Sequence, residues 1–158
     1  MIVDANLTDL VFIAKLLRNR DKQELAATRS DVDPDQLAID SYNSHWRKVA
    51  YTDDNFPAMA IGARVTHPGV ATVWGFATDH YRKVIRELSN YVEKAMIPEI
   101  VGSGVHRAQC LVHPENRASQ RWLKSLGFIQ EATLRGFGSS REDMLLFAWL
   151  DHEFSRTD

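Results

Sequence analysis

The fold is decided by one stretch near the C-terminus, residues 113–128, which reads His113-Pro114-Glu115-Asn116-Arg117-Ala118-Ser119-Gln120-Arg121-Trp122-Leu123-Lys124-Ser125-Leu126-Gly127-Phe128. Asn116 can accept hydrogen bonds from the unpaired N–H groups of a helix start, so it predicts a helix over 117–126. Gly127 suits the left-handed residue that follows a helix end. Phe128 then opens a strand that we expect to continue to Arg135.

The segments around this stretch complete a strand pattern. Residues 106–113 alternate weakly and end at Pro114, which predicts a strand directly before the helix. Residues 144–150 predict the second strand of a hairpin with 128–135. The loop between these two strands, 136–141, contains two glycines.

The middle of the chain predicts three consecutive strands and a long helix. The strands cover 48–52, 56–65 and 70–78, and we expect them to pair as antiparallel hairpins. The helix covers about 80–97, and we expect Pro98 and the cluster Gly102-Ser103-Gly104 to end it. A strand, a helix and another strand form a right-handed crossover, which places the strand over 106–113 parallel to the one over 70–78.

The N-terminal third predicts one short strand and two helices. Ile2-Val3 can form the strand, and Asn6 or Thr8 can cap the first helix. Asp33 and Pro34 predict a second helix start, with the helix running to about Trp46. The element order is β-α-α-β-β-β-α-β-α-β-β. It predicts the α/β (α+β) class, with a mixed, mostly antiparallel sheet flanked by helices.

Composition narrows the class of protein. The chain has 158 residues, 44% of them hydrophobic, and a net charge of −2, which fits one domain over 1–158. The charge gives no electrostatic case for nucleic acid, and no run approaches the length that spans a bilayer. Cys110 is the only cysteine, the six histidines show no zinc spacing, and no metal is expected. We expect a cytoplasmic protein without a signal peptide, as a monomer or homodimer.

Residues 113–128 and their continuation to Ala148 resemble the Gcn5-related N-acetyltransferase (GNAT) superfamily. The shared pattern is the Asn, the Ala and Ser on the first helical turn, and the Leu-Gly-Phe that opens the next strand. The resemblance is closest to the ribosomal-protein and N-terminal-amine branch. It implies the GNAT acyl-CoA N-acyltransferase fold and transfer of an acetyl group from acetyl-CoA to an amine, as a protein N-terminus or lysine.

The resemblance also implies where acetyl-CoA binds. The strand ending near Thr78 and its parallel neighbour ending near His113 should separate, leaving a wedge for the extended thioester arm. Asn116 is implied to contact the cofactor arm, and Ser119 faces the same region. The full set of expected cofactor-binding residues is Phe76, Thr78, Tyr81, Arg82, Lys83, Asn116 and Ser119.

The phosphate-binding loop departs from the family pattern. Working members follow Arg/Gln-x-x-Gly-x-Gly/Ala, whose backbone N–H groups hold the pyrophosphate. Counting from Arg82, Ile85 and Glu87 stand where the small residues belong, and Asp79 adds a repelling charge. One interpretation is that acetyl-CoA still binds, with Arg82 and Lys83 replacing backbone contacts. The other is that binding is lost and these cations form a solvated helix face.

The second interpretation leads to an alternative function. Trp74-Gly75-Phe76-Ala77-Thr78 is similar to the corresponding strand end in acetyltransferase-like proteins of short-tailed phages. The alternative is a catalytically inactive GNAT-like binding protein, encoded by a phage and acting on a host or virion partner in the host cytoplasm.

Two residues are candidates for the catalytic base, which must take a proton from the amine. Glu115 and His113 both lie at the end of the strand that lines the reaction centre. Glu115 also suits a structural role, because a carboxylate is favourable at a helix N-terminus, and His113 could lie at the surface. The tyrosine that many family members use as an acid is replaced by Leu123.

An acidic segment offers a site for the acceptor. The resemblance implies an acceptor site between the first two helices and the final hairpin, and Asp31, Asp33, Asp35 and Asp40 would steer a cationic amine toward it. The alternative interpretation is a helix N-terminus rich in aspartate for reasons of the helix dipole.

Overall fold

One seven-stranded sheet organises the chain. A computed structural model describes residues 1–151, and the strand order in the sheet is β1-β2-β3-β4-β5-β7-β6. The strands are β1 (Ile2–Asp4), β2 (Trp46–Tyr51), β3 (Pro57–His67), β4 (Val70–Ala77), β5 (Arg107–Val112), β6 (Ile129–Leu134) and β7 (Met144–Leu150). Among the strands of residues 1–151, only β4 and β5 pair in parallel, so the predicted mixed, mostly antiparallel sheet is confirmed.

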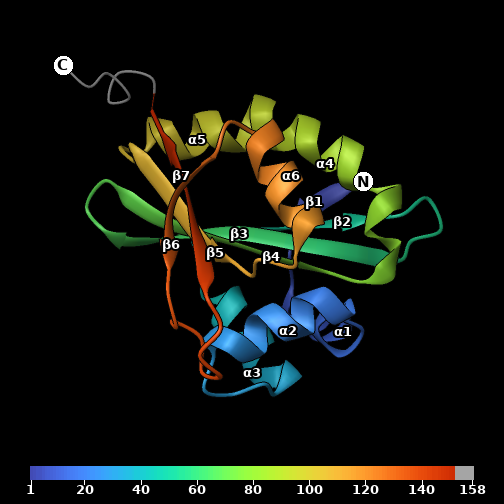
Figure 1. Ribbon diagram of the computed structural model, residues 1–158. Coiled ribbons are helices and arrows are strands. Elements are labelled where there is room, and N and C mark those ends of the chain that lie inside the picture. Colours follow the sequence, from blue (N-terminus) through green and yellow to red (C-terminus); the bar gives the residue numbers. More distant parts are fainter. Residues whose placement is uncertain (152–158) are drawn as a thin grey trace.

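Helices cover both faces of the sheet (Figure 1). One face carries α1 (Leu7–Lys15), α2 (Asn19–Thr28) and α3 (Pro34–Tyr42). The other carries the 3₁₀ turn η1 (Asp79–Lys83), α4 (Ile85–Tyr91), the π-turn η2 (Val92–Met96), α5 (Ile97–Gly102) and α6 (Arg117–Ser125). Each face buries its own cluster of apolar side chains, with Leu88 and Phe147 in one and Leu10 and Ile13 in the other.

The helix caps that the sequence predicts are confirmed. Asn6 Oδ1 accepts the N–H of Asp9 at 2.8 Å, and Asp33 Oδ1 accepts the N–H of Asp35 at 3.2 Å. Gly127, directly beyond α6, has φ of +95°. This is the left-handed conformation that glycine adopts without a steric penalty.

The structure corrects two predicted helix ends and adds one helix. Helix α3 ends at Tyr42 rather than near Trp46, which begins β2 and packs in the core. Helix α2 has no counterpart in the predicted order, because its sequence lacks the apolar stripe that signals a helix. The helix after β4 continues past Pro98 to Gly102, since the π-turn before it changes the hydrogen-bonding register and the N–H of Ile97 bonds to Val92.

No helix within residues 1–151 combines the length and the apolar character that crossing a bilayer requires. Even the continuous helical segment from α4 through η2 to α5 carries several charged residues.

Candidate functional site

Strands β4 and β5 separate after a short paired segment. They pair at Val70–Arg107, Ala71–Ala108 and Thr72–Gln109, and no further pair follows although both strands continue. A cavity of about 380 Å³ opens where they part. The expected wedge between these strands is therefore confirmed.

The cavity passes from one face of the sheet to the other. On the α4–α6 side its wall is apolar, with Ile85, Val92, Met96, Trp122, Leu123 and Leu126. The indole Nε1 of Trp122 donates to Ser89 Oγ at 2.7 Å and so ties α6 to α4. On the α2 side the charged residues Arg18, Asp21 and Glu24 lie beside apolar Leu25, Trp74 and Phe76. The two ends of the cavity therefore suit different parts of a ligand.

The open edge of β4 presents backbone groups to the cavity. Thr78 donates its N–H to Ala58 O of the neighbouring β3 at 2.9 Å. Hydrogen-bonding directions alternate along an antiparallel strand, so Ala77 and Gly75 turn their N–H and C=O groups away from β3 and toward the opening. Asp21 Oδ2 accepts the N–H of Ala77 at 2.8 Å, and the N–H of Arg18 donates to Ala77 O at 2.9 Å. The groups of Ala77 are thus already paired with α2 and its N-cap.

Arg18 and Asp21 form a nearly buried ion pair. Arg18 Nη2 lies 2.8 Å from Asp21 Oδ1, and Arg18 Nε lies 3.2 Å from Asp21 Oδ2. The guanidinium also stacks over the ring of Tyr81, 4.6 Å from its centroid. A bidentate pair of this kind is held in one geometry, so it fixes α2 against the end of β4.

Glu24 lies at the other side of the opening, where β5 ends. Its Oε2 accepts the backbone N–H of His113 at 3.2 Å and Asn116 Nδ2 at 2.7 Å. Burial raises the pKa of Glu24 to about 7, although both hydrogen bonds act to lower it. The pKa of Cys110 on β5 is raised to about 12, by burial first and by the charge of Glu24 second.

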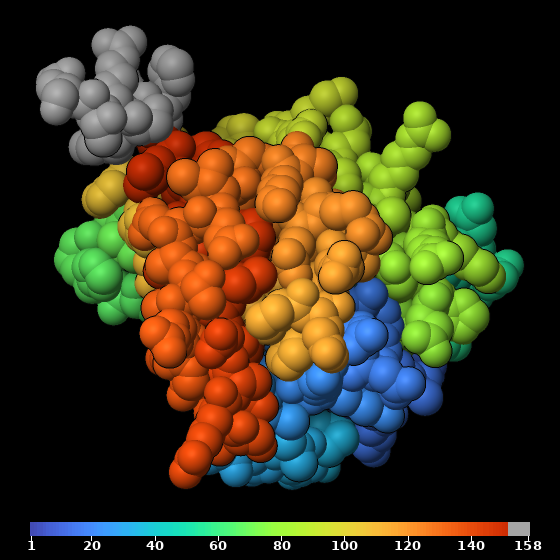
Figure 2. Space-filling model, in the orientation of Figure 1, coloured from blue at the N-terminus to red at the C-terminus, as the bar shows by residue number. Residues whose placement is uncertain are grey.

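Asn116 connects these groups. It is 1% exposed, and its Oδ1 accepts Arg18 Nη2 at 3.3 Å and the N–H of Ser119 at 3.4 Å. One side chain thereby caps α6 and bonds to both Arg18 and Glu24 of the α2 region. Figure 2 shows this contact between the two helices on the surface, where the orange α6 segment lies against blue α2.

Each of the two predicted base candidates has one of its proton-accepting atoms engaged in hydrogen bonds. Glu115 is exposed, and its Oε2 accepts Arg20 Nη1 at 2.9 Å and Gln23 Nε2 at 3.1 Å. These partners, Gln23 first, hold the pKa of Glu115 below its ordinary value. His113 is buried rather than at the surface, and its Nδ1 accepts the N–H of Glu115 at 3.1 Å. The structure places both beside the opening, with Glu115 directed toward solvent.

The expected cofactor residues around the end of β4 fall into two groups. Phe76 and Thr78 are buried: Phe76 pairs with Ala60 and stacks on Trp74, while Thr78 Oγ1 caps η1 through the N–H of His80. Tyr81 is half-buried, while Arg82 and Lys83 are exposed on η1. Residues 79–83 form a 3₁₀ turn without any glycine, so its backbone is not the glycine-rich cradle of the family pattern.

The structure brings together His113, Asn116 and Ser119, as expected, and joins Tyr81 to them through Arg18. It adds three residues that are not among the candidates predicted from the sequence: Arg18, Asp21 and Glu24. A signal for them exists, because a spacing of three places all three on one face of a helical segment. The polar sequence around them hides this signal.

The acidic segment is largely structural. Asp33 caps α3, and Asp40 pairs with Arg29, with Oδ2 and Nη2 2.6 Å apart. These contacts support the interpretation of an aspartate-rich helix start rather than an acceptor site.

Among known proteins, this chain matches solved structures. No family model and no curated protein matches the sequence. Solved structures match over nearly the whole chain. A ribosomal-protein-alanine N-acetyltransferase from Brucella melitensis is 17% identical with a TM-score of 0.71, covering 95% of this chain and 99% of its own.

Two further structures agree. A GCN5-related N-acetyltransferase from Kribbella flavida is 16% identical with a TM-score of 0.72, covering 95% of this chain and 96% of its own. A GNAT-family acetyltransferase from Bacillus anthracis is 14% identical with a TM-score of 0.70, covering 94% and 93%. The chain has the acyl-CoA N-acyltransferase fold that the resemblance implied.

Proposed function

We propose that this protein is an N-acetyltransferase that moves an acetyl group from acetyl-CoA to an amine. The observation that carries the proposal is the separation of β4 from β5, with a cavity of about 380 Å³ between two strands that begin as a parallel pair. A cavity through a sheet costs backbone hydrogen bonds. A ligand with amide groups of its own can form hydrogen bonds with the backbone groups that the separated strands leave unpaired.

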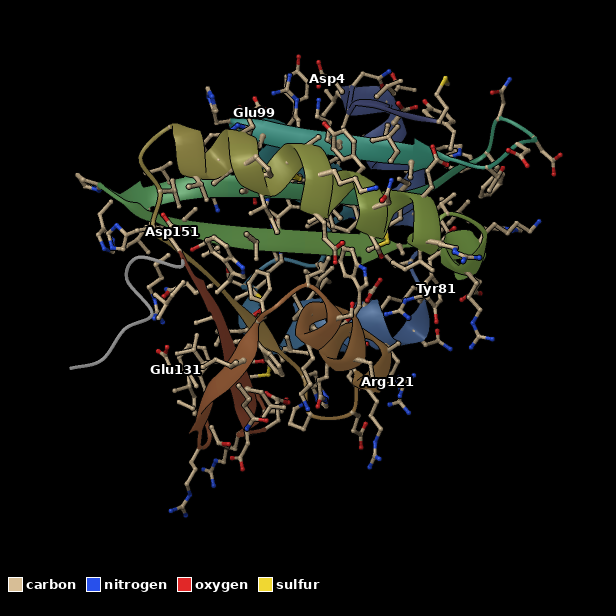
Figure 3. All side chains as sticks on the ribbon, turned by 90° about the horizontal axis from the view of Figure 1, so that it is seen from above. Asp4, Tyr81, Glu99, Arg121, Glu131 and Asp151 are labelled. Carbon is tan, nitrogen blue, oxygen red and sulfur yellow. The ribbon has the colours of Figure 1, made fainter. Side chains whose placement is uncertain are left out.

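The opening fits the chemistry of coenzyme A. The coenzyme's arm carries two amides, and the N–H and C=O of Gly75 face the space that such an arm would enter. Exposed cations flank both sides and can attract phosphates. They are Arg82, Lys83 and Arg86 after β4, and Arg117, Arg121 and Lys124 on α6. Figure 3 marks the two sides with Tyr81 and Arg121. In this proposal side chains replace the missing glycine-rich cradle.

The acceptor is proposed to approach from the side of α2. There the wall of the opening carries Glu24, whose carboxylate has one oxygen unengaged and suits a cationic amine. The Brucella melitensis enzyme named above acts on a ribosomal-protein alanine, which makes a protein N-terminus the first acceptor to examine and a lysine side chain the second. The amine would attack the thioester directly while both substrates are bound.

Two measurements test the proposal. Calorimetry with acetyl-CoA should give saturable binding that weakens with added salt, because exposed cations supply part of the attraction. Release of the coenzyme A thiol should follow when peptides with free N-termini or lysines are added.

A matched variant locates the phosphate contacts. The triple change Arg82→Gln, Lys83→Gln and Arg86→Gln should weaken acetyl-CoA binding and flatten its salt dependence. Glu99→Gln, at an exposed position of α5 that does not line the cavity, should change neither. Absence of both binding and thiol release would overturn the proposal and leave the inactive binding protein as the function to pursue.

A further inference from the structure

We infer that Glu24 is the general base that prepares the amine for attack, an inference that rests on the proposed acetyl transfer. Among the residues bordering the β4–β5 opening, it combines a fixed carboxylate, an unengaged oxygen and a place on the acceptor side.

The carboxylate is held by one oxygen only. Oε2 accepts the N–H of His113 and the amide Nδ2 of Asn116, at 3.2 and 2.7 Å. Within residues 1–151 no hydrogen bond or ion pair to Oε1 is found, and the side chain borders the cavity. Two donors from different elements therefore orient Glu24 while the second oxygen stays available for a proton.

The charges around Glu24 leave it without a cation of its own. On α2 and its N-cap it faces Asp21 and Arg18, and on β5 it faces Cys110 and the backbone of His113. The guanidinium of Arg18 is engaged by Asp21 and Asn116 instead. Burial keeps the pKa of Glu24 near 7, so at neutral pH the carboxylate exists in part as the base and binds a proton strongly enough to remove one from an amine.

The other two candidates meet these conditions less well. Glu115 is exposed and forms an ion pair with Arg20, and its contacts, Gln23 first, lower its pKa, which makes it a weaker base than Glu24. His113 already uses the lone pair of Nδ1 to accept the N–H of Glu115. We therefore assign these two residues to positioning the strand end and the start of α6.

The proton balance is simple. The acceptor enters as an ammonium ion, and the Glu24 carboxylate takes one proton to give the free amine. The amine nitrogen forms a C–N bond with the thioester carbonyl carbon, and the C–S bond breaks. The second proton passes from nitrogen to the leaving thiolate, and Glu24 returns its proton to solvent. The products are the amide and the free thiol of coenzyme A.

The test is a kinetic comparison of the wild type with Glu24→Gln. The glutamine keeps the size and can still accept both hydrogen bonds through its oxygen. We expect kcat to fall by about 100-fold or more, while the affinity for acetyl-CoA stays within about threefold. In the wild type, kcat/KM should decline below a pH of about 7, and the variant should lose this acid limb. A purely structural role would not remove a limb from the pH profile.

Control variants separate the possible failures. Glu99→Gln, a surface change on α5, should behave as the wild type. Glu24→Asp keeps a carboxylate but withdraws it, so it should retain the acid limb at a lower rate, which also covers the case in which the glutamine variant does not fold.

The inference fails if Glu24→Gln keeps both its rate and its acid limb in an active background, or if Glu115→Gln is the more damaging change. If the wild type itself neither binds acetyl-CoA nor releases thiol, the proposed acetyl transfer fails first.

Discussion

Replacing Glu24 by Gln should change how the stability of the protein depends on pH. The native carboxyl group takes up its proton near pH 7, whereas an ordinary glutamate does so near 4.5. Between these values the folded protein holds more protons than the unfolded chain. The free energy of unfolding therefore falls as the pH rises through this window. The glutamine variant lacks the titrating group and should not show this decrease.

The size of the effect follows from the two pKa values. The difference between about 7 and 4.5, at about 1.4 kcal/mol per pKa unit, corresponds to about 3 kcal/mol. Below pH 4 the carboxyl group is protonated in both the folded and the unfolded protein, so the wild type loses no stability there. Above pH 8 it is ionised in both, and the loss of stability is complete. Asp21, Arg18, Cys110 and His113 also face Glu24, but both proteins contain them. The difference between the two curves therefore isolates Glu24.

Urea unfolding at half-unit steps from pH 4 to pH 9 measures this difference. Relative to the variant, the wild type should lose about 3 kcal/mol across the range, with its midpoint between pH 5 and 7. The Glu99→Gln protein provides the control and should run parallel to the wild type. Curves for wild type and Glu24→Gln that stay parallel within 0.5 kcal/mol (roughly the error of extrapolation), or a difference of opposite sign, would refute the buried, proton-binding state of Glu24.

Two further substitutions test the elements that hold the site. Asn116→Ala removes the cap of α6 and should cost about 1 kcal/mol of stability. It also removes a donor that lowers the pKa of Glu24, so the pH midpoint of the stability curve should move upward, and an unchanged midpoint would contradict the contact. Gly127→Ala places a side chain at φ of +95° and should cost about 1–2 kcal/mol in thermal or urea unfolding, whereas a neutral result would show that the turn relaxes.

Most of the fold could be predicted because its elements carry local signals. Asn116 and Gly127 mark both ends of α6, and Asp33 with Pro34 marks the start of α3. The failures occur where tertiary packing overrides such a signal. Trp46 continues the helical spacing of α3 and yet begins β2, since its side chain is buried in the sheet's core.

The helix after β4 shows a second limit. Pro98 normally ends a helix because it lacks an N–H and its ring crowds the preceding turn. Here the turn before it is a π-turn, whose wider register places Pro98 at the start of α5. A sequence pattern assumes one repeat length and cannot signal that the repeat changes at Val92.

The sequence predicts the residues on the β5–α6 side of the opening between β4 and β5, but not those on the α2 side. The candidates in and after β5 come from a motif with a recognisable order, and the structure gathers His113, Asn116 and Ser119 at the opening. The facing residues come from α2, whose charged side chains look like a solvated helix in the sequence. Asp21 and Glu24 gain their roles from contacts to Ala77 and Asn116 that lie far away along the chain.

The contact between Ala77 and Asp21 has a consequence for observing motion of α2. The amide of Ala77 donates to a side chain on α2, while the neighbouring amide of Thr78 donates to β3. Exchange of the Ala77 amide with deuterated solvent therefore reports the detachment of α2, and exchange at Thr78 reports the opening of the sheet. These adjacent positions give the protein an internal pair of reporters that distinguishes loosening at the mouth of the cavity from loss of the whole structure.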